Sequence, residues 1–249
     1  MSSLNKIFAV LEAVVSHQDS GLNFAAVVST TGLPKASAHR ILKALTDLGY
    51  LSLSPETKRY RGTLKLAALG AEVTSNFDLR DYVHPQLLKL HQETSHTSNM
   101  GIRNGEVGIY VDKIESLDYG IKLFSEIGKS FPLHCTGMGK ILLAFGEAED
   151  IERILSRPLK AFTEKTITDQ AVLKAELEEI RTEGYAVDRE EITRGIMCVA
   201  APVFGLQGKI VCAISAAFPS YINSDRGITR EIEALKRHAD AISGMLKRR

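Results

Sequence analysis

In the first fifty residues, apolar positions recur at helical spacing between short polar breaks, which predicts three consecutive helices. The first is expected over residues 4–15 and the second, which is short, over 24–30. Pro34 stands at the start of the third, where a missing N–H is tolerated because the first turn of a helix leaves its N–H groups unpaired. This third helix is expected from about Lys35 to Leu48, and Gly49 stops it.

Two short extended segments follow, over 50–53 and 58–61, and the polar residues between them form the turn of a hairpin. Helix, helix, turn, helix and hairpin is the order of a winged helix-turn-helix. A further apolar stripe predicts a helix from Thr63 to about Ser75, which leads into the polar segment 75–81. We therefore expect a domain boundary in this segment.

Beyond residue 80 the hydrophobic period changes from helical to alternating. Asn104-Gly105 separates two alternating segments within 98–114, which is a strong hairpin signal. The other expected elements are a helix over 82–93, an apolar segment at 121–124, a loop over 125–134, helices over 137–145, 148–156 and 169–183, a strand or strand end at 185–192, neighbouring strands over 198–204 and 210–218, and a C-terminal helix that starts at Ser224 and Asp225. Intermixed strands and helices predict an α+β fold for this part.

The composition is that of a globular chain of 249 residues, with 44% hydrophobic and 24% charged positions. No stretch of 18 apolar residues is present, so we expect no membrane span. The apolar N-terminal stretch has helical spacing and no small-residue cleavage site, which argues against a signal peptide. Cys135, Cys198 and Cys212 show no CxxC spacing, which favours a reducing cytoplasm over a disulfide framework or a zinc site. We expect no metal and no cofactor.

The charges are unevenly distributed along the chain. The net charge is only +1 with His neutral, but residues 35–65 hold seven Lys or Arg against two acidic residues. Local basicity of this kind indicates a nucleic-acid-binding surface even where the whole chain is close to neutral.

The third helix and the hairpin present the side chains that we expect to contact DNA. An α-helix fits the major groove, where its early residues meet base edges and longer basic side chains reach phosphates. The candidates are Ser37, His39 and Arg40 for base edges, Lys35 and Lys43 for phosphates, Ala36 as a small residue that allows close approach, and Lys58, Arg59 and Arg61 of the hairpin for the DNA backbone or the neighbouring minor groove. The alternatives are a solvated basic face and a winged helix used for protein–protein contact.

Five segments resemble the IclR family of bacterial transcriptional regulators, in an order and spacing that extend over essentially the whole chain. They are GLPKASAHRILKALTDLGYL, RYRGTLKLAALG, FPLHCTGMGKILLAF, GYAVDREEITRGIMCVAAPVF and AISAAFPS. The resemblance implies a winged helix-turn-helix over 1–62, a linker helix over 63–78, and an effector-binding and oligomerisation domain related to GAF and PAS folds over 79–249. It also implies a homodimer or dimer of dimers that binds a palindromic operator in double-stranded DNA, repressing or activating, under the control of a small carboxylic acid.

The segment HCTGMGK at 134–140 is typical of a loop that leads into a helix. Thr136 is a candidate cap, and the N–H groups at a helix N-terminus favour anions. The segment is not a phosphate loop, because His134 stands where the first glycine is needed and Ile141 follows Lys140 in place of Ser or Thr. Given the resemblance, we expect a carboxylate here rather than a nucleotide.

The resemblance also implies where the effector binds. In family members with small keto-acid effectors, the backbone at the central pair of this motif, an acidic residue, a cysteine and two serines contact the ligand. The corresponding positions are Gly137, Met138, Asp188, Cys198, Ser215 and Ala217, with wall residues expected at Ile121, Leu123, Phe131 and Ile196. Ala217 lacks the hydroxyl of the second serine, and Met138 adds apolar bulk. Because a site built to hydrogen-bond a ligand group discriminates strongly for it, these departures favour a larger or less polar acid than glyoxylate.

Other interpretations of the C-terminal part stay open. Cys198 could be a core thiol and Asp188 could lie in a solvated turn, while Cys135 and Cys212 are expected as buried hydrophobic side chains. A second hypothesis is an enzyme with Cys198 as nucleophile and with His134 and Asp188 as its partners, although no nucleophile-elbow motif is present. A third is a regulator whose C-terminal domain serves only for dimerisation.

Overall fold

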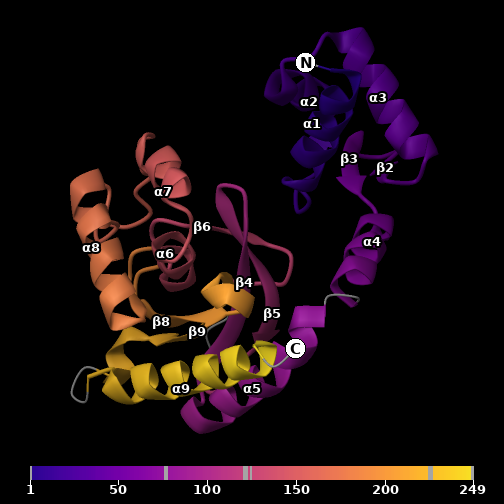
Figure 1. Cartoon of the computed structure of the whole chain (residues 1–249). Helices are drawn as coiled ribbons and strands as arrows, with labels where there is room; N and C mark the ends of the chain where they lie inside the picture. The colour runs from indigo at the N-terminus through magenta and orange to yellow at the C-terminus, as the bar shows by residue number, and fades with distance from the viewer. Residues whose placement is uncertain (1, 76–77, 120–122, 124, 224–226, 248–249) are drawn as a thin grey trace. The chain divides into compact units, whose positions relative to one another are not determined.

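The chain folds into two compact units, Met1–Asn76 and Phe77–Arg249, and each has its own hydrophobic core (Figure 1). The computed structural model describes residues 2–75, 78–119, 123, 125–223 and 227–247. Of the expected segment 121–124, only Leu123 is among them. The expected helix start at Ser224 and Asp225 lies outside the described residues.

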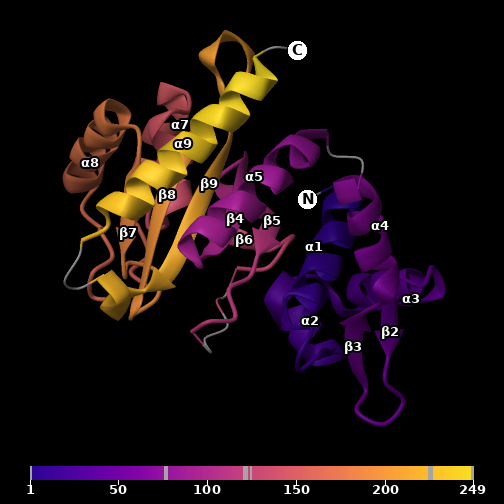
Figure 2. The ribbon, with the colours of Figure 1, turned by 90° about the horizontal axis from the view of Figure 1, so that it is seen from below.

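The first unit is the winged helix-turn-helix that the hydrophobic pattern predicts. Its elements are α1 (Ser3–Val15), β1 (Leu22–Asn23), α2 (Phe24–Thr31), α3 (Lys35–Asp47), β2 (Leu51–Leu53), β3 (Arg59–Gly62) and α4 (Leu64–Ser75). The three strands form a small antiparallel sheet in the order β1-β3-β2. The β2–β3 hairpin extends beyond the helices of the unit (Figure 2).

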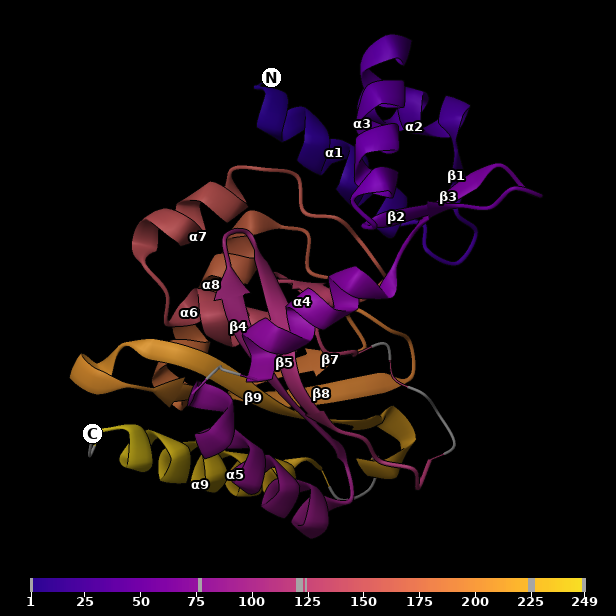
Figure 3. The same ribbon diagram turned by 90° about the vertical axis from the view of Figure 1, so that its right-hand side faces the viewer.

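Local sequence explains where α2 begins and ends and which face of α3 is buried. The Asn23 side chain accepts a hydrogen bond from the N–H of Ala26 at 2.9 Å, and Gly32 follows α2 with a φ of 65°. A positive φ strains any residue that carries a Cβ, which is why glycine stands there. α3 packs against α1 and α2 through Ala38, Ile41, Leu42 and Leu45 (Figure 3). Its opposite face is left to solvent.

The second unit is built on a six-stranded antiparallel sheet in the order β6-β5-β4-β9-β8-β7. Its elements are α5 (Asp78–Thr94), β4 (Thr97–Asn104), β5 (Val107–Ile114), β6 (Ser130–Pro132), α6 (Gly137–Ala144), α7 (Ala148–Leu155), α8 (Gln170–Glu183), β7 (Ala186–Arg189), β8 (Ile196–Phe204), β9 (Ile210–Pro219) and α9 (Thr229–Leu246), with short 3₁₀ turns at Leu206–Gly208 and Ser220–Asn223. Helices α5 and α9 cover one face of the sheet, and α6, α7 and α8 lie on the other (Figure 1). This is the α+β class that the sequence predicts.

The loop predicted over 125–134 is wrong at Ser130–Pro132, which pairs with β5 as the edge strand β6. The physical reason is the burial of Phe131, which is only 3% exposed. Its ring lies directly over two glycines: a Cβ built on Gly108 would be 2.0 Å from the ring, and one on Gly101 would be 2.7 Å from it. The buried Phe131 ring holds this edge strand in place. The strand therefore forms without the run of strand-forming residues by which the sequence would have predicted it.

Gly108→Ala is expected to lower the free energy of unfolding of the second unit by about 1–3 kcal/mol, because the added methyl group forces the buried ring aside. Gly244→Ala in α9 is the control, since no described atom lies within 4 Å of its added Cβ. This helical substitution should raise the free energy of unfolding by about 0.5–1 kcal/mol. Urea unfolding followed by circular dichroism measures both, and equal stabilities would contradict the role given to Phe131.

Candidate functional site

The exposed face of α3 carries most of the side chains expected to contact DNA. Lys35, Ala36, His39, Arg40 and Lys43 are all exposed. Ser37 is half-buried beside the apolar stripe, so the exposed row along the helix runs through Ala36 rather than through Ser37. The small exposed residue at the start of this face is therefore Ala36.

Two side chains on this face have partners within the unit. The His39 ring packs edge-on against the Phe24 ring of α2, with 6.1 Å between the ring centroids. The Lys43 ammonium lies 2.7 Å from the Asp47 carboxylate, and both side chains are more than half exposed. An exposed pair of this kind contributes at most about 1 kcal/mol, so Lys43 can exchange it for a phosphate.

Arginines of the hairpin hold it against the loop that precedes β1. Nη1 of Arg59 donates to the carbonyl oxygen of Gly21 at 2.9 Å, and Nη2 of Arg61 donates to that of Asp19 at 3.0 Å. A guanidinium has five N–H donors, so these bonds leave others for further partners. Lys58 is exposed at the turn with a φ of 54°. Part of the positive charge of the hairpin therefore has a structural role.

In the second unit the sheet brings together residues that are far apart in the sequence. Asp188 of β7 pairs with Cys198 of β8, which pairs in turn with Ala217 of β9. Ser215 shares their face of the sheet because side chains alternate along a strand. The start of α6 packs on the same face, where a Cβ built on Gly137 would lie 3.4 Å from Sγ of Cys198. The positions that the resemblance implies for the effector are therefore neighbours.

The carboxyl group of Asp188 is buried, with 1% of the residue exposed. Its Oδ1 accepts a hydrogen bond from the N–H of Glu191 at 2.7 Å. Burial raises the pKa of Asp188 to about 7, although the Glu191 N–H acts in the opposite direction. Near neutral pH this carboxyl is therefore present in both forms, and its protonated form can donate a hydrogen bond.

All eight residues of α6 are buried, and a side-chain cap fixes its start. Oγ1 of Thr136 accepts a hydrogen bond from the N–H of Gly139 at 3.1 Å, which confirms the predicted cap. A Cβ on Gly139 would lie 2.6 Å from the carbonyl oxygen of Leu133, so only glycine fits there. Because the cap uses the Gly139 N–H, the amide groups left at the start of α6 are those of Gly137 and Met138, and the Gly137 N–H already faces the Cys198 thiol, whose pKa it acts to lower.

Lys140, the fourth residue of α6, is completely buried. Its ammonium donates to Oε1 of Glu191 at 2.6 Å, to Oε1 of Glu176 at 2.8 Å and to the carbonyl oxygen of Val187 at 2.7 Å. Burial by itself acts to lower the pKa of Lys140, but the two carboxylates outweigh it and raise the pKa above its ordinary value. This ammonium joins α6 to α8 and to the strand that carries Asp188.

Phe131, one of the expected wall residues, and Met138 of the motif's central pair are both buried beside this face. A Cβ on Gly101 would lie 3.2 Å from the terminal methyl group of Met138, so the methionine and the Phe131 ring share the space above that glycine. A methionine side chain has three rotatable bonds and adapts readily to its surroundings. Of these two side chains, Met138 is therefore the one better able to move for a ligand.

The other expected wall residues lie further from the start of α6 in the sequence. Ile196 begins β8 two residues before Cys198 and is half-buried. Leu123 is half-buried in the connection between β5 and β6. Ile121 lies outside the described residues.

Asn99 and Tyr110 belong to this face, and the sequence interpretation missed both. Asn99 of β4 pairs with Ser215 of β9 and is 3% exposed. Burial, together with the nearby Cys198 and Asp188, raises the pKa of the Tyr110 phenol. The alternating pattern predicts the two strands of this hairpin, but it does not say that β4 pairs with a strand more than a hundred residues later. The one sequence signal that could have pointed to Asn99 is the presence of a polar amide within an expected strand.

The structure does not assemble the catalytic residues of the enzyme hypothesis. Nε2 of His134 lies 3.0 Å from the carbonyl oxygen of Lys160, and its ring packs against Phe162. Burial, with Asp188 nearby, raises the pKa of the Cys198 thiol to about 12, whereas a nucleophilic cysteine needs a lowered pKa. His134 thus has partners of its own, and the Cys198 thiol is neutral at pH 7.

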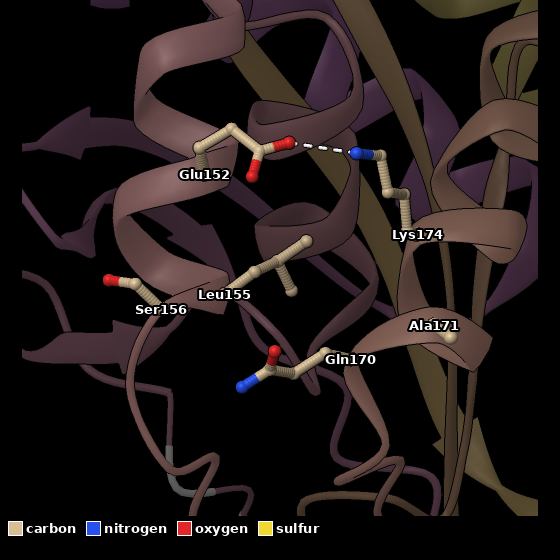
Figure 4. A pocket seen from close by; sticks show the side chains of 6 residues that line it. All are labelled: Glu152, Leu155, Ser156, Gln170, Ala171 and Lys174. Carbon is tan, nitrogen blue, oxygen red and sulfur yellow. Dashed lines mark hydrogen bonds and ion pairs between the residues drawn. The ribbon is translucent and has the colours of Figure 1, made fainter.

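Two hollows on the surface of the second unit lie apart from this face. One of about 280 Å³ lies between α7 and α8 and is lined by Glu152, Leu155, Ser156, Gln170, Ala171 and Lys174 (Figure 4). An ion pair of 2.8 Å between Glu152 and Lys174 spans it, and five of the six lining residues are exposed. The other, of about 240 Å³, lies beside Phe204, Arg181 and Lys236. Neither contains the buried polar groups that orient a small ligand.

Two known families match the chain. The IclR helix-turn-helix domain matches residues 3–55, and the bacterial transcriptional regulator IclR C-terminal domain matches residues 71–244. The chain belongs to the IclR family of bacterial transcriptional regulators. In an IclR-type regulator the first unit binds DNA and the second binds the effector. Among the described helices, none combines the length and the apolar character needed to cross a bilayer.

Individual members of the IclR family are similar over nearly the full chain. The HTH-type transcriptional regulator KdgR of Escherichia coli (strain K12) is 31% identical over 247 residues, which cover 99% of this chain and 93% of KdgR. The crystal structure of Thermotoga maritima IclR has a TM-score of 0.72 at 31% identity and covers 98% of each chain. An IclR homologue from Microbacterium hydrocarbonoxydans, complexed with 4-hydroxybenzoate, has a TM-score of 0.80 and covers 98% of this chain and 99% of the homologue; at 21% identity it shows the fold alone.

Lys140→Met should lower the free energy of unfolding by about 3–5 kcal/mol, because it leaves the buried Glu191 carboxylate without its counter-charge. Lys174→Met is the matched control, since that lysine pairs with Glu152 where both side chains are more than half exposed. The control should change the free energy by less than about 1 kcal/mol. Urea unfolding compares the two, and equal losses would show that the buried ammonium has no special structural role.

Asp188→Asn should change how stability depends on pH. The pKa of Asp188 rises from 3.8 to about 7 on folding, so the folded state holds this proton more tightly than the unfolded state does. The resulting stabilisation is fully present below the unfolded pKa and is lost as the pH rises through the folded pKa. The free energy of unfolding of the wild type should therefore fall relative to that of Asp188→Asn as the pH rises from about 4 to about 7, as measured by urea unfolding at each pH. Parallel pH profiles would contradict the raised pKa.

Proposed function

We propose that this IclR-family protein is a transcription factor whose operator binding is controlled by a small organic acid held in the second unit. The observation that carries the proposal is the convergence of Asp188, Cys198 and Ser215 on the N-terminus of α6. A helix N-terminus favours a carboxylate, and protonated Asp188 supplies a hydrogen-bond donor beside it. In the Microbacterium homologue this fold accommodates 4-hydroxybenzoate, an organic acid.

The DNA-binding surface of the proposal is α3 with the β2–β3 hairpin. Arg40 and His39 would meet base edges, Lys35 and Lys43 would contact phosphates, and Lys58 would reach the DNA backbone beside them. A homodimer, or a dimer of dimers, would place two such helices on half-sites of a palindromic operator about 34 Å apart or a multiple of that distance. The protein would act in the cytoplasm, where the DNA is.

The effector would act by changing the equilibrium between two arrangements of the paired DNA-binding units. It can do so only if it binds the two arrangements with unequal affinity. The linker helix α4 is the segment through which a change in the second unit would reach α3. This mechanism requires that the effector alters operator affinity without touching DNA.

The two other hypotheses have less support. The high pKa of the Cys198 thiol and the separate partners of His134 speak against acyl transfer. A domain used only for dimerisation has no need of a carboxyl group that burial destabilises, such as that of Asp188. Turnover of an organic acid by the purified protein would support the enzyme instead.

The test of the proposal is a mobility-shift assay with the purified chain and the DNA upstream of its own gene, at fixed salt, with and without a panel of carboxylic acids. Selective binding that one acid alters would support both parts of the proposal. Selective binding that no acid alters would remove the organic-acid effector from the proposal and leave the transcription factor. The absence of sequence-selective binding would overturn the proposal.

Arg40→Ala is expected to weaken binding to the operator by about 1–3 kcal/mol, a factor of roughly 5 to 150, because it removes a base-edge contact. Arg157→Ala is the charge-matched control, since Arg157 pairs with Glu106 in the second unit. Titration of operator and of scrambled DNA measures affinity and selectivity for each variant. If the two variants bind the operator equally well, Arg40 does not read DNA.

A further inference from the structure

Asn99 is a buried amide in the centre of the proposed effector site. It lies directly opposite Ser215 in the β4–β9 pairing, and only 3% of it is exposed. Its Nδ2 donates to Oγ of Ser215 at 3.4 Å, which is longer than a typical N–H···O hydrogen bond. The sheet places it on the same face as Asp188 and Cys198, under the start of α6.

The amide oxygen of Asn99 is buried and has no hydrogen-bond partner among the described residues. Buried polar atoms in native proteins are nearly always paired, so an unpaired one calls for an explanation. A bound ligand that supplies the missing partner is such an explanation, because Asn99 faces the polar groups of the effector site.

The chemistry of an amide narrows the ligand group to a hydroxyl. In the observed orientation of the Asn99 amide, the unpaired atom is Oδ1, which needs a hydrogen-bond donor. If the amide is rotated by 180°, the unpaired group is NH₂, which needs an acceptor. A hydroxyl both donates and accepts, so it satisfies either orientation. A ligand carboxylate satisfies only the second orientation.

We infer that Asn99 is a specificity-determining residue for the effector, and that the effector is a hydroxylated organic acid whose hydroxyl group bonds the Asn99 amide while its carboxylate meets the N-terminus of α6. This inference rests on the proposed effector site. It also changes the expectation of a less polar acid to that of an acid with a hydroxyl group. Asn99 is a diagonal neighbour of Ala217 across β4 and β9, so its amide supplies polar contact next to the position where the second serine is replaced.

The test uses thermal shift and calorimetry on the full chain with pairs of acids that differ by one hydroxyl: lactate and propionate, 3-hydroxybutyrate and butyrate, 4-hydroxybenzoate and benzoate. A hydroxylated acid should raise the melting temperature of the wild type more than its partner does. Asn99→Leu, which is close in volume, should weaken binding of that acid by about 10- to 100-fold and leave the partner unchanged. If leucine does not fit, Asn99→Ala serves for the same comparison.

Ser98→Ala is the matched control. Ser98 is the next residue on the same strand, is fully buried, and also has an unpaired side-chain oxygen among the described residues, but it points to the opposite face of the sheet. Ser98→Ala and Asn99→Leu each remove one unpaired polar atom from β4. Ser98→Ala should nevertheless bind every acid as the wild type does. If the substitutions acted only by destabilising β4, both variants would bind the acids more weakly than the wild type does.

The inference is overturned if Asn99→Leu binds the hydroxylated acid as tightly as the wild type does, or if no hydroxylated acid shifts the wild type. Operator binding measured on the same preparations separates this failure from failure of the proposed function. Selective operator binding without any response to hydroxylated acids would leave the regulator and reject the ligand class. Loss of selective operator binding in the wild type would reject the regulator itself.

Discussion

The buried ammonium of Lys140 is the contact on which the arrangement of the effector-binding unit depends. An uncompensated charge in a protein interior is very costly, so Lys140 is stable there only while Glu176, Glu191 and the Val187 carbonyl surround it. These partners lie on α8, within β7 and in the turn that follows β7. The ion pairs thus hold α6 down on the sheet and hold the turn that gives Asp188 its hydrogen bond from Glu191.

Close packing of small residues makes this arrangement possible. A Cβ on Gly137 would lie 3.2 Å from that of Ala200, so α6 approaches β8 as closely as two backbones with small side chains allow. Gly101 and Gly108 likewise leave room for the buried Phe131 ring. The glycines of HCTGMGK are therefore needed for packing. The close approach of α6 to β8 brings the N-terminus of the helix to Cys198, and a larger residue at position 137 would prevent it.

The basic charge of the DNA-binding unit is divided between structure and recognition. Arg59 and Arg61 bond to backbone carbonyls, and Lys65 of α4 donates to the carbonyl oxygen of Leu48 at 2.8 Å, beyond the C-terminal end of α3. Lys65 also lies 4.3 Å from the centre of the Tyr50 ring. A cation at a helix C-terminus is favourable because the helix dipole is negative there. The linker helix is thereby attached to the recognition helix, and Arg40 stays exposed on its outer face.

The sequence by itself determined the local elements and the fold class. Helical spacing, the Asn23 and Thr136 caps, Gly32 and the Asn104-Gly105 turn act over a few residues, so the order of the pattern is enough to recognise them. Only the tertiary structure decided which polar groups meet. Lys140 finds its carboxylates 36 and 51 residues away, and Asn99 finds Ser215 116 residues away. No periodicity carries that information, because partners across a sheet or between helices are chosen by the packing of the whole unit; the edge strand at Phe131 was mispredicted for the same reason.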